Sequence, residues 1–187
     1  MKILLVSVLV FVSVMAVAAA PQAQGDVVHA LRKGGYVLFL RHTATNPEQA
    51  DTDPLNLNNI KSQRQLMDEG RNQAKALGAA LKQLKIPVGK ILASKFYRAR
   101  ETAELLGLGE VEAVLDITEG GLVVSPRENQ RRAVARRVLL ATAPPEGKNT
   151  IIVSHRTNLQ DAAAVVGAAP VDSRSALRLA ESGGARR

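Results

Sequence analysis

Reactive and charged side chains follow four short apolar runs of this sequence. The runs occupy residues 35–40, 90–94, 111–117 and 150–153, and their composition is typical of buried strands. The side chains that close or follow these runs are, in chain order, Arg41, His42, Ser94, Arg98, Glu119, Ser154 and His155. In open α/β sheets, ligands bind outside the carboxyl ends of the strands. We therefore expect these side chains to meet in one crevice.

Two histidines, two arginines and one carboxyl group form a set that is suited to phosphoryl transfer. A guanidinium presents a rigid fork of donors that matches pairs of phosphate oxygens. A neutral imidazole is a competent nucleophile, and a second histidine can stabilise charge on the phosphoryl oxygens. A carboxylic acid can protonate the leaving alkoxide and then deprotonate water. Singly, each residue has a plainer interpretation as a hydrogen-bonded or solvated residue; together they predict a phosphohistidine mechanism that needs no metal and no cofactor.

Helical patterns separate the expected strands, and a polar stretch rich in asparagine, aspartate and proline indicates one long loop. The helices are expected over residues 27–32, 71–84 (with Asp68 as the N-cap), 98–106 and 126–142, and the loop over 43–63. The last helix is indicated by a capping box from Ser125 to Glu128, with proline at the first helical position. Strands that alternate with helices predict an α/β fold, a three-layer α/β/α sandwich around a largely parallel sheet.

Three segments resemble motifs of the histidine phosphatase superfamily, also called phosphoglycerate mutase-like proteins. They are Leu40-Arg41-His42-Thr43-Ala44-Thr45, Ser94-Lys95-Phe96-Tyr97-Arg98-Ala99-Arg100-Glu101-Thr102-Ala103 and Val153-Ser154-His155. The resemblance covers residues 35–161 and implies a phosphoglycerate mutase-like fold and a phosphatase of the histidine acid type. It implies that His42 is the phosphorylated nucleophile. Arg41, Arg98 and His155 would form the phosphate pocket, with His155 also catalytic, and Glu119 stands near the place where many relatives carry the proton donor.

The chain departs from the family pattern near both histidines and at its end. Thr43 replaces the usual glycine after the nucleophile, and Glu48 stands where an asparagine is often found. Arg156 replaces the glycine after the second histidine and is either a third phosphate contact or a solvated loop residue. Residues 167–187 contain no strand-like run, so we expect an atypical disordered tail there and a phosphatase domain over 24–166.

The first 23 residues are expected to be a secretory signal peptide. Lys2 precedes a long apolar run that ends in small residues, and cleavage is expected between Ala18 and Ala23. An uncleaved N-terminal membrane anchor is the alternative, because about 18–20 apolar residues could span a bilayer. The predicted location is the periplasm or the cell exterior, with no stable membrane insertion after cleavage.

Composition narrows the possible function classes. The 187 residues include three histidines and no cysteine, which excludes a disulfide framework, a thiolate zinc site and a cysteine nucleophile. The net charge is +8, but only 3% of the residues are aromatic and no nucleic-acid-binding motif is present, so nucleic acid is not an expected partner. The expected partner is a small phosphorylated substrate, and the oligomeric state is left open. A catalytically weakened phosphate- or anion-binding protein of the same fold is the alternative function.

Two charged clusters lie outside the motifs. Asp51 and Asp53 are expected to be solvated turn residues, with cation binding as the alternative, in a loop that could form the rim of the substrate site. The arginine pairs at 131–132 and 136–137 are expected to form a solvated basic helix face, with an anionic partner as the alternative.

Overall fold

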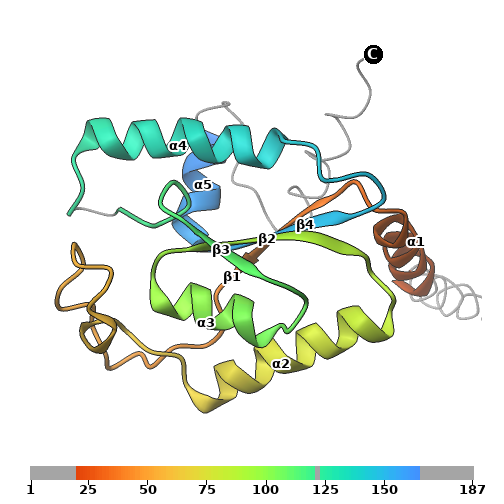
Figure 1. Cartoon of the computed structure of the whole chain (residues 1–187), viewed down its shortest axis with the longest axis horizontal. Coiled ribbons are helices and arrows are strands. Elements are labelled where there is room, and N and C mark those ends of the chain that lie inside the picture. Colours follow the sequence, from red (N-terminus) through yellow and green to blue (C-terminus); the bar gives the residue numbers. More distant parts are fainter. Residues whose placement is uncertain (1–19, 121–122, 165–187) are drawn as a thin grey trace, which may run out of the picture.

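The computed structural model describes residues 20–120 and 123–164, which form a parallel sheet with helices on both faces (Figure 1). The elements in chain order are α1 (Ala20–Lys33), β1 (Val37–Arg41), the short 3₁₀ helix η1 (Ile60–Ser62), α2 (Asp68–Gln83), β2 (Val88–Ser94), α3 (Tyr97–Leu105), β3 (Val111–Val114), α4 (Pro126–Ala141), β4 (Asn149–Ser154) and α5 (Arg156–Ala164). Helices α2 and α3 cover one face of the sheet, and α4 and α5 cover the other, which confirms the predicted three-layer fold. Residues 1–19 of the expected signal peptide and the whole expected tail lie outside the described residues.

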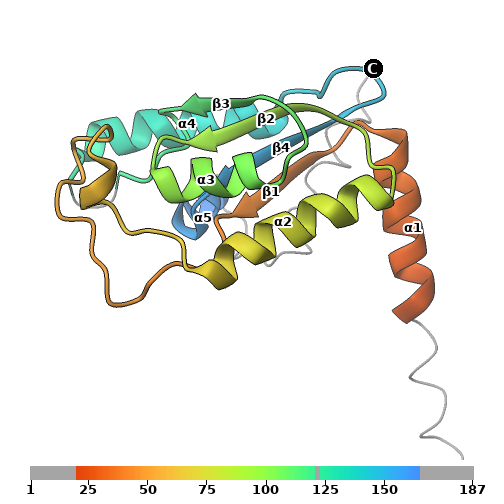
Figure 2. The same ribbon diagram turned by 60° about the horizontal axis from the view of Figure 1, so that its bottom comes forward.

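The sheet has the strand order β1-β4-β2-β3, and all of its pairings are parallel. Arg41 lies opposite Ser154 at the end of the β1–β4 pair, and Ser94 lies opposite Val114 at the end of the β2–β3 pair. The carboxyl ends of the strands therefore share one edge. This edge faces the long loop that joins β1 to α2 (Figure 2). It is the edge at which ligands bind in open α/β sheets.

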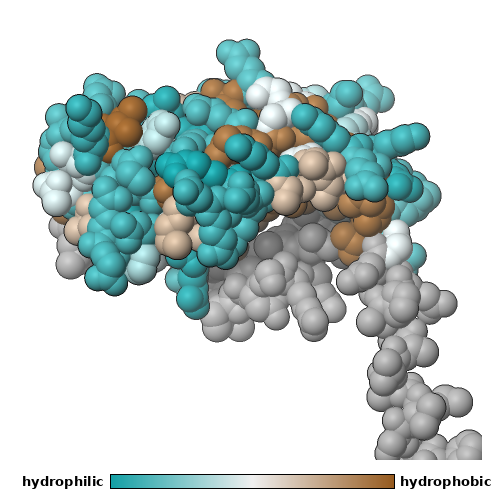
Figure 3. Space-filling model, turned by 90° about the horizontal axis from the view of Figure 1, so that it is seen from below, coloured by the Kyte–Doolittle hydropathy of each residue, from teal (hydrophilic) through white to brown (hydrophobic). Residues whose placement is uncertain are grey.

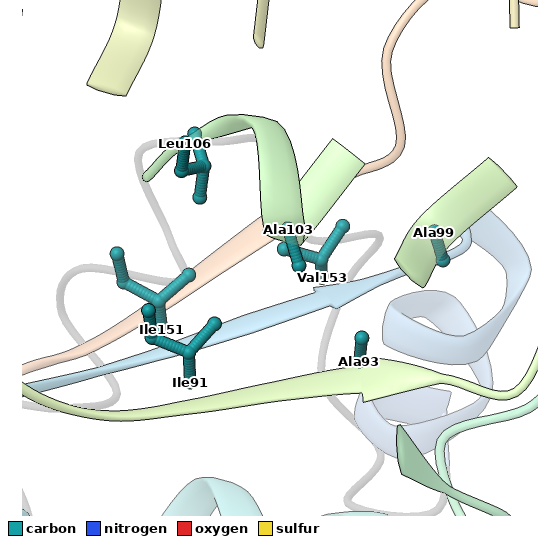
Figure 4. Packing of buried hydrophobic residues seen from close by; sticks show 7 residues of the cluster. All are labelled: Ile91, Ala93, Ala99, Ala103, Leu106, Ile151 and Val153. Carbon is teal, nitrogen blue, oxygen red and sulfur yellow. The ribbon is translucent and has the colours of Figure 1, made fainter. Parts of the chain in front are cut away.

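The central strand β4 is buried along its whole length because helices cover both faces of the sheet. On the α3 side, the core cluster consists of Ile91, Ala93, Ala99, Ala103, Leu106, Ile151 and Val153 (Figure 4). The alanines of α3 have no exposed surface, and their small side chains let this helix lie close to β2 and β4. On the opposite face Ile152 packs with Leu92 and Ile117. Burial of each isoleucine contributes roughly 1.5–3 kcal/mol, so the central strand is firmly held.

The boundaries of α2, α3 and α4 agree with the expected helices to within three residues. Helix α1 is longer than the expected helix over 27–32, and α5 was not expected. Helix α4 begins at Pro126, and the Ser125 hydroxyl accepts the Glu128 N–H at 3.3 Å, which confirms the predicted N-terminal cap. Asp68 is not the N-cap of α2; Met67 occupies that position in extended conformation and its N–H donates to the Ala44 carbonyl at 3.1 Å. With Met67 as the N-cap, Asp68 lies in the first helical turn. There its carboxylate interacts favourably with the positive end of the helix dipole.

Strand β3 is shorter than the predicted strand over 111–117. After Val114 the chain turns, with the Thr118 N–H donating to the Leu115 carbonyl at 2.8 Å. Ile117 is only 1% exposed because the turn directs it into the core. The apolar run over 111–117 thus combines an edge strand with a buried turn. Both parts are apolar in composition, so the sequence does not show where the strand ends.

The predicted solvated basic face of α4 is wrong for two of its four arginines. Arg132 and Arg136 are 8% and 3% exposed, and their Nη1 atoms donate to the carbonyls of Thr118 and Asp116, each at 3.3 Å. These carbonyls belong to the turn after β3, beneath which α4 packs. Arg131 is half-exposed and pairs with carboxylates on the surface. The buried pair therefore supplies donors to the turn that follows β3, which is the edge strand of the described sheet.

Seen from the side of α2, the surface is mainly hydrophilic, with hydrophobic residues scattered across it (Figure 3). Among the described residues, no helix combines the length and the apolar character that crossing a membrane requires.

Candidate active site

His42 follows β1 directly and extends the β1–β4 ladder, because its N–H donates to the Ser154 carbonyl at 3.0 Å. Its side chain is buried, with 6% of the residue exposed. The ring Nδ1 lies 2.9 Å from the carbonyl oxygen of Thr43. A carbonyl can only accept, so the neutral ring carries its proton on Nδ1 and has a lone pair on Nε2.

Burial lowers the pKa of His42 to about 4. The positive charges of Arg98, Arg41 and Arg64 act in the same direction, while the bond to the Thr43 carbonyl opposes them. The ring is therefore neutral at neutral and mildly acidic pH, as a nucleophile must be.

His155 follows β4 and stands beside His42, with the two ring centroids 5.3 Å apart and the rings edge-to-face. The residue is 2% exposed, and burial followed by the charge of Arg98 holds its pKa well below the usual value. Its Nε2 lies 2.8 Å from the Ser94 hydroxyl oxygen at the end of β2. That oxygen also accepts the Phe96 N–H at 3.2 Å, which leaves the Ser94 proton free to be donated to Nε2. In that arrangement the ring proton of His155 is on Nδ1.

Arg98 lies in the first turn of α3 and is 1% exposed. Its Nη1 is 2.9 Å from an oxygen of Asp51, and its Nη2 is 3.8 Å from an oxygen of Glu119. The guanidinium also lies over the Phe96 ring, 4.2 Å from the centroid. A buried guanidinium with partners on several sides has a fixed direction, as a group that positions a phosphate must have.

Glu119 lies beyond the turn that ends β3 and connects the two buried groups. Its Oε2 is 3.6 Å from Nδ1 of His155, an atom without a hydrogen-bond partner among the described residues. Its other oxygen accepts the hydroxyl of Thr157 at 2.7 Å. The side chain is 31% exposed, so it is in contact with both solvent and the histidine pair.

A pocket of about 580 Å³ opens beside His42, on the side of the loop. Its lining residues are Arg41, His42, Thr43, Ala44, Thr45, Pro47, Arg64 and Gln73. The structure thus brings together the two histidines, two arginines and one carboxyl group of the predicted set: Arg41, His42, Arg98, Glu119 and His155. Arg156 is exposed at the start of α5.

Two residues of this region escaped the sequence reasoning. The expectation that Asp51 is a solvated turn residue is wrong, because its Oδ1 accepts both Arg98 Nη1 and the Arg64 N–H, each at 2.9 Å. The Asp53 carboxylate accepts the Asn59 side-chain amide within the loop. Arg64 lines the pocket, and nothing in the spacing of a polar loop distinguishes it from its neighbours. In the part of the chain that the structure describes, no three histidine, aspartate or glutamate residues are grouped to hold a metal ion.

Thr102 belongs to the second motif, and its hydrogen bonds show what a threonine contributes at that position. Its hydroxyl donates to the Arg98 carbonyl at 2.7 Å and accepts the Thr43 N–H at 3.2 Å. It therefore links α3, which carries Arg98, to the residue after His42.

Comparison with known protein families finds a similarity over the first part of the site. Residues 37–122 match the model of the histidine phosphatase superfamily (branch 1). Over this segment the chain is similar to the histidine phosphatase superfamily. The segment includes Arg41, His42, Arg98 and Glu119, while His155 lies beyond it. The resemblance noted in the motifs is confirmed.

The fold is similar to that of a solved phosphatase structure. A mycobacterial glucosyl-3-phosphoglycerate phosphatase in complex with VO3 is 19% identical, with a TM-score of 0.51 over 71% of this chain and 82% of that chain. The protein histidine phosphatase SixA with tungstate is 20% identical, with a TM-score of 0.47 over 73% and 80% of the two chains. The putative phosphohistidine phosphatase SixA from Nakamurella multipartitia is 19% identical, with a TM-score of 0.49 over 75% of each chain. None of the curated proteins compared with the chain matches it.

Proposed function

We propose that this chain is a phosphomonoesterase that hydrolyses a phosphate ester through a phosphohistidine on His42, without a metal ion. The observation that carries the proposal is the state of the His42 ring. The Thr43 carbonyl fixes the proton on Nδ1, so Nε2 has a lone pair, and burial keeps the ring neutral. Around this nucleophile stand guanidinium groups and a second imidazole, which are the donors that a phosphoryl group requires.

In the first step, the lone pair of His42 Nε2 attacks phosphorus and the bond from phosphorus to the ester oxygen breaks. Arg41, Arg98 and His155 bind the phosphoryl oxygens, and His155 stabilises their charge as the transition state forms. Glu119, as the carboxylic acid, gives its proton to the departing alkoxide. Its position beside Arg98 and His155, with partial exposure, supports this role.

In the second step, water attacks the phosphorus of phosphohistidine. Glu119, now a carboxylate, accepts a proton from that water, and the bond from phosphorus to Nε2 breaks with its electron pair returning to the ring. Phosphate leaves, and both His42 and Glu119 are restored to their starting states. General acid–base catalysis of this kind contributes roughly 10²–10⁴ in rate.

The proposal extends to location. The apolar run and the small residues of the first 23 positions support export to the periplasm or the cell exterior. N-terminal sequencing of the protein recovered from a periplasmic extract tests this, and a chain that keeps Met1 would favour the anchored alternative.

The decisive experiment for the activity compares wild type with His42→Ala on an aryl phosphate at mildly acidic pH, with a chelator present. We expect wild-type turnover and its loss in the variant. His29→Ala is the matched control, because His29 is an exposed residue of α1. Brief exposure to labelled substrate should leave acid-labile label on wild type alone. A wild-type rate equal to the His42→Ala background would contradict the phosphatase and leave the anion-binding alternative, which equilibrium dialysis with inorganic phosphate measures.

A further inference from the structure

Arg64 and Arg98, two arginines of the site, differ in their carboxylate partners. Arg98 has carboxylates of Asp51 and Glu119 as neighbours. The guanidinium of Arg64 has no carboxylate partner among the described residues. The residue is partly exposed, and its Nε, like that of Arg98, is buried without an acceptor. A buried donor without an acceptor costs roughly 1–3 kcal/mol, so an arginine is retained in such a place at the expense of stability.

The backbone of Arg64 is nevertheless held firmly. Its N–H donates to Asp51 Oδ1, the same oxygen that accepts Arg98 Nη1. Its neighbour Gln63 has no exposed surface and bonds through its side chain to the Tyr97 N–H at 2.7 Å and to the Leu57 carbonyl at 2.9 Å. One carboxylate thus fixes the backbone of Arg64 relative to the guanidinium of Arg98. The point from which the Arg64 side chain extends is therefore fixed before any ligand arrives.

The pocket that Arg64 lines has a definite chemistry. Besides the histidine and two arginines, Thr43, Thr45 and Gln73 supply polar groups, and only Ala44 and Pro47 are apolar. Among the described residues that line it there is no phenylalanine, tyrosine or tryptophan, which does not favour a bulky apolar leaving group. A volume of about 580 Å³ lies within the range of sites for whole small molecules, and exceeds what a phosphoryl group alone would fill.

We propose that Arg64 binds a second anionic group of the substrate, so that the substrate is a small phosphomonoester whose leaving group carries a carboxylate or a second phosphate. This inference rests on the proposed phosphatase function. The transferred phosphoryl group is served by Arg41, Arg98 and His155, which leaves the guanidinium of Arg64 for another anion. A fork of N–H donors matches a carboxylate or phosphate in pairs. A neutral leaving group would leave the buried Nε of Arg64 without an acceptor.

Two esters of equal chain length test the proposal: phosphoglycolate, which carries a carboxylate, and ethyl phosphate, which does not. We expect wild type to prefer phosphoglycolate, and Arg64→Gln to lower kcat/KM for phosphoglycolate at least about tenfold more than for ethyl phosphate. Arg64→Lys should restore part of the preference. Lys61→Gln is the control, since it removes one positive charge from an exposed position of the same loop and should leave the preference unchanged. The bisphosphate of ethylene glycol distinguishes a second phosphate from a carboxylate.

The outcomes separate this inference from the proposed function. Equal losses for both esters in Arg64→Gln would place Arg64 on the transferred phosphoryl group and overturn the inference, as would no loss at all. If wild type hydrolyses no ester, the proposed function fails. In that case, calorimetric titration of the His42→Gln variant with the two esters tests the role of Arg64 independently of turnover. Tighter binding of phosphoglycolate than of ethyl phosphate, lost when Arg64→Gln is added, supports the inference, and equal binding of the two esters overturns it.

Discussion

A carboxylate oxygen of Asp51 lies 2.9 Å from the Nη1 of Arg98, across 47 positions of sequence. The contact joins the loop between β1 and α2 to the first turn of α3. Arg98 is almost fully buried, and a buried charge is tolerated only with a partner. The loop therefore completes the site and does more than border it.

Asp51→Asn should destabilise the protein, because the amide cannot neutralise the buried guanidinium of Arg98. We expect a loss of about 1–3 kcal/mol in the free energy of unfolding, measured by urea denaturation, together with lower turnover. Asp53→Asn is the control, since it weakens only a bond to Asn59 within the loop. Similar losses in the two variants would contradict a bridging role for Asp51.

Acidification should destabilise the fold through His42. Its pKa is about 4 in the folded chain against about 6.5 when unfolded, so between these values the unfolded state binds a proton that the folded state does not. The free energy of unfolding therefore falls as the pH drops from about 6.5 to about 4, by at most about 3 kcal/mol from this group. His42→Gln should show a shallower fall across this window in denaturation curves at several pH values. An unchanged slope in the variant would refute the assignment.

Ser94→Ala should lower activity more than its effect on stability explains. The change removes the hydroxyl that contacts His155 Nε2 and the acceptor of the Phe96 N–H. We expect kcat to fall about tenfold, with an altered pH profile, because the proton position on His155 is no longer fixed. Ser125→Ala, which removes the α4 cap, should cost about 1 kcal/mol in stability and leave kcat unchanged. Equal kcat in the two variants would show that the Ser94 hydroxyl is only structural.

Arg132→Met should destabilise the protein although it removes a charge from an arginine-rich helix. The buried guanidinium donates to the Thr118 carbonyl, which would lose its partner at a cost of about 1–3 kcal/mol. Arg131→Gln at the adjacent, half-exposed position should have little effect on thermal unfolding, since exposed ion pairs contribute little. A larger loss of stability in Arg131→Gln than in Arg132→Met would contradict the structural role of Arg132.

The parts of the molecule that sequence could predict are those governed by short-range patterns. Apolar runs located the four strands, and the Ser125 cap with Pro126 located α4, because these signals lie within a few residues of one another. Placing His42 and His155 at strand ends was enough to bring them together, since parallel strands share their carboxyl edge. The parallel topology of the sheet therefore brought residues from separate local patterns together in one site.

The residues that were misjudged are those whose role depends on a distant partner. Asp51 has the local signature of a turn residue, and only the fold shows that Arg98 lies opposite it. Arg132 and Arg136 have the composition of a solvated face, yet they face carbonyls of a turn formed where β3 ends early. Whether a side chain reaches a backbone carbonyl depends on the path of the chain. Residue types alone therefore do not predict such hydrogen bonds.

The two histidines of the site differ in how their protons are held, and this has a consequence for divergence. The His42 tautomer depends on the main-chain carbonyl of its own neighbour, a group that every amino acid carries. Substitutions at position 43 would preserve that acceptor, which accommodates the threonine found there. The His155 tautomer depends instead on one hydroxyl, that of Ser94, and a single codon change removes it. Related chains that lose the Ser94 hydroxyl would keep the His42 tautomer but not that of His155. Under the proposed function, such chains would bind phosphate without hydrolysing its esters.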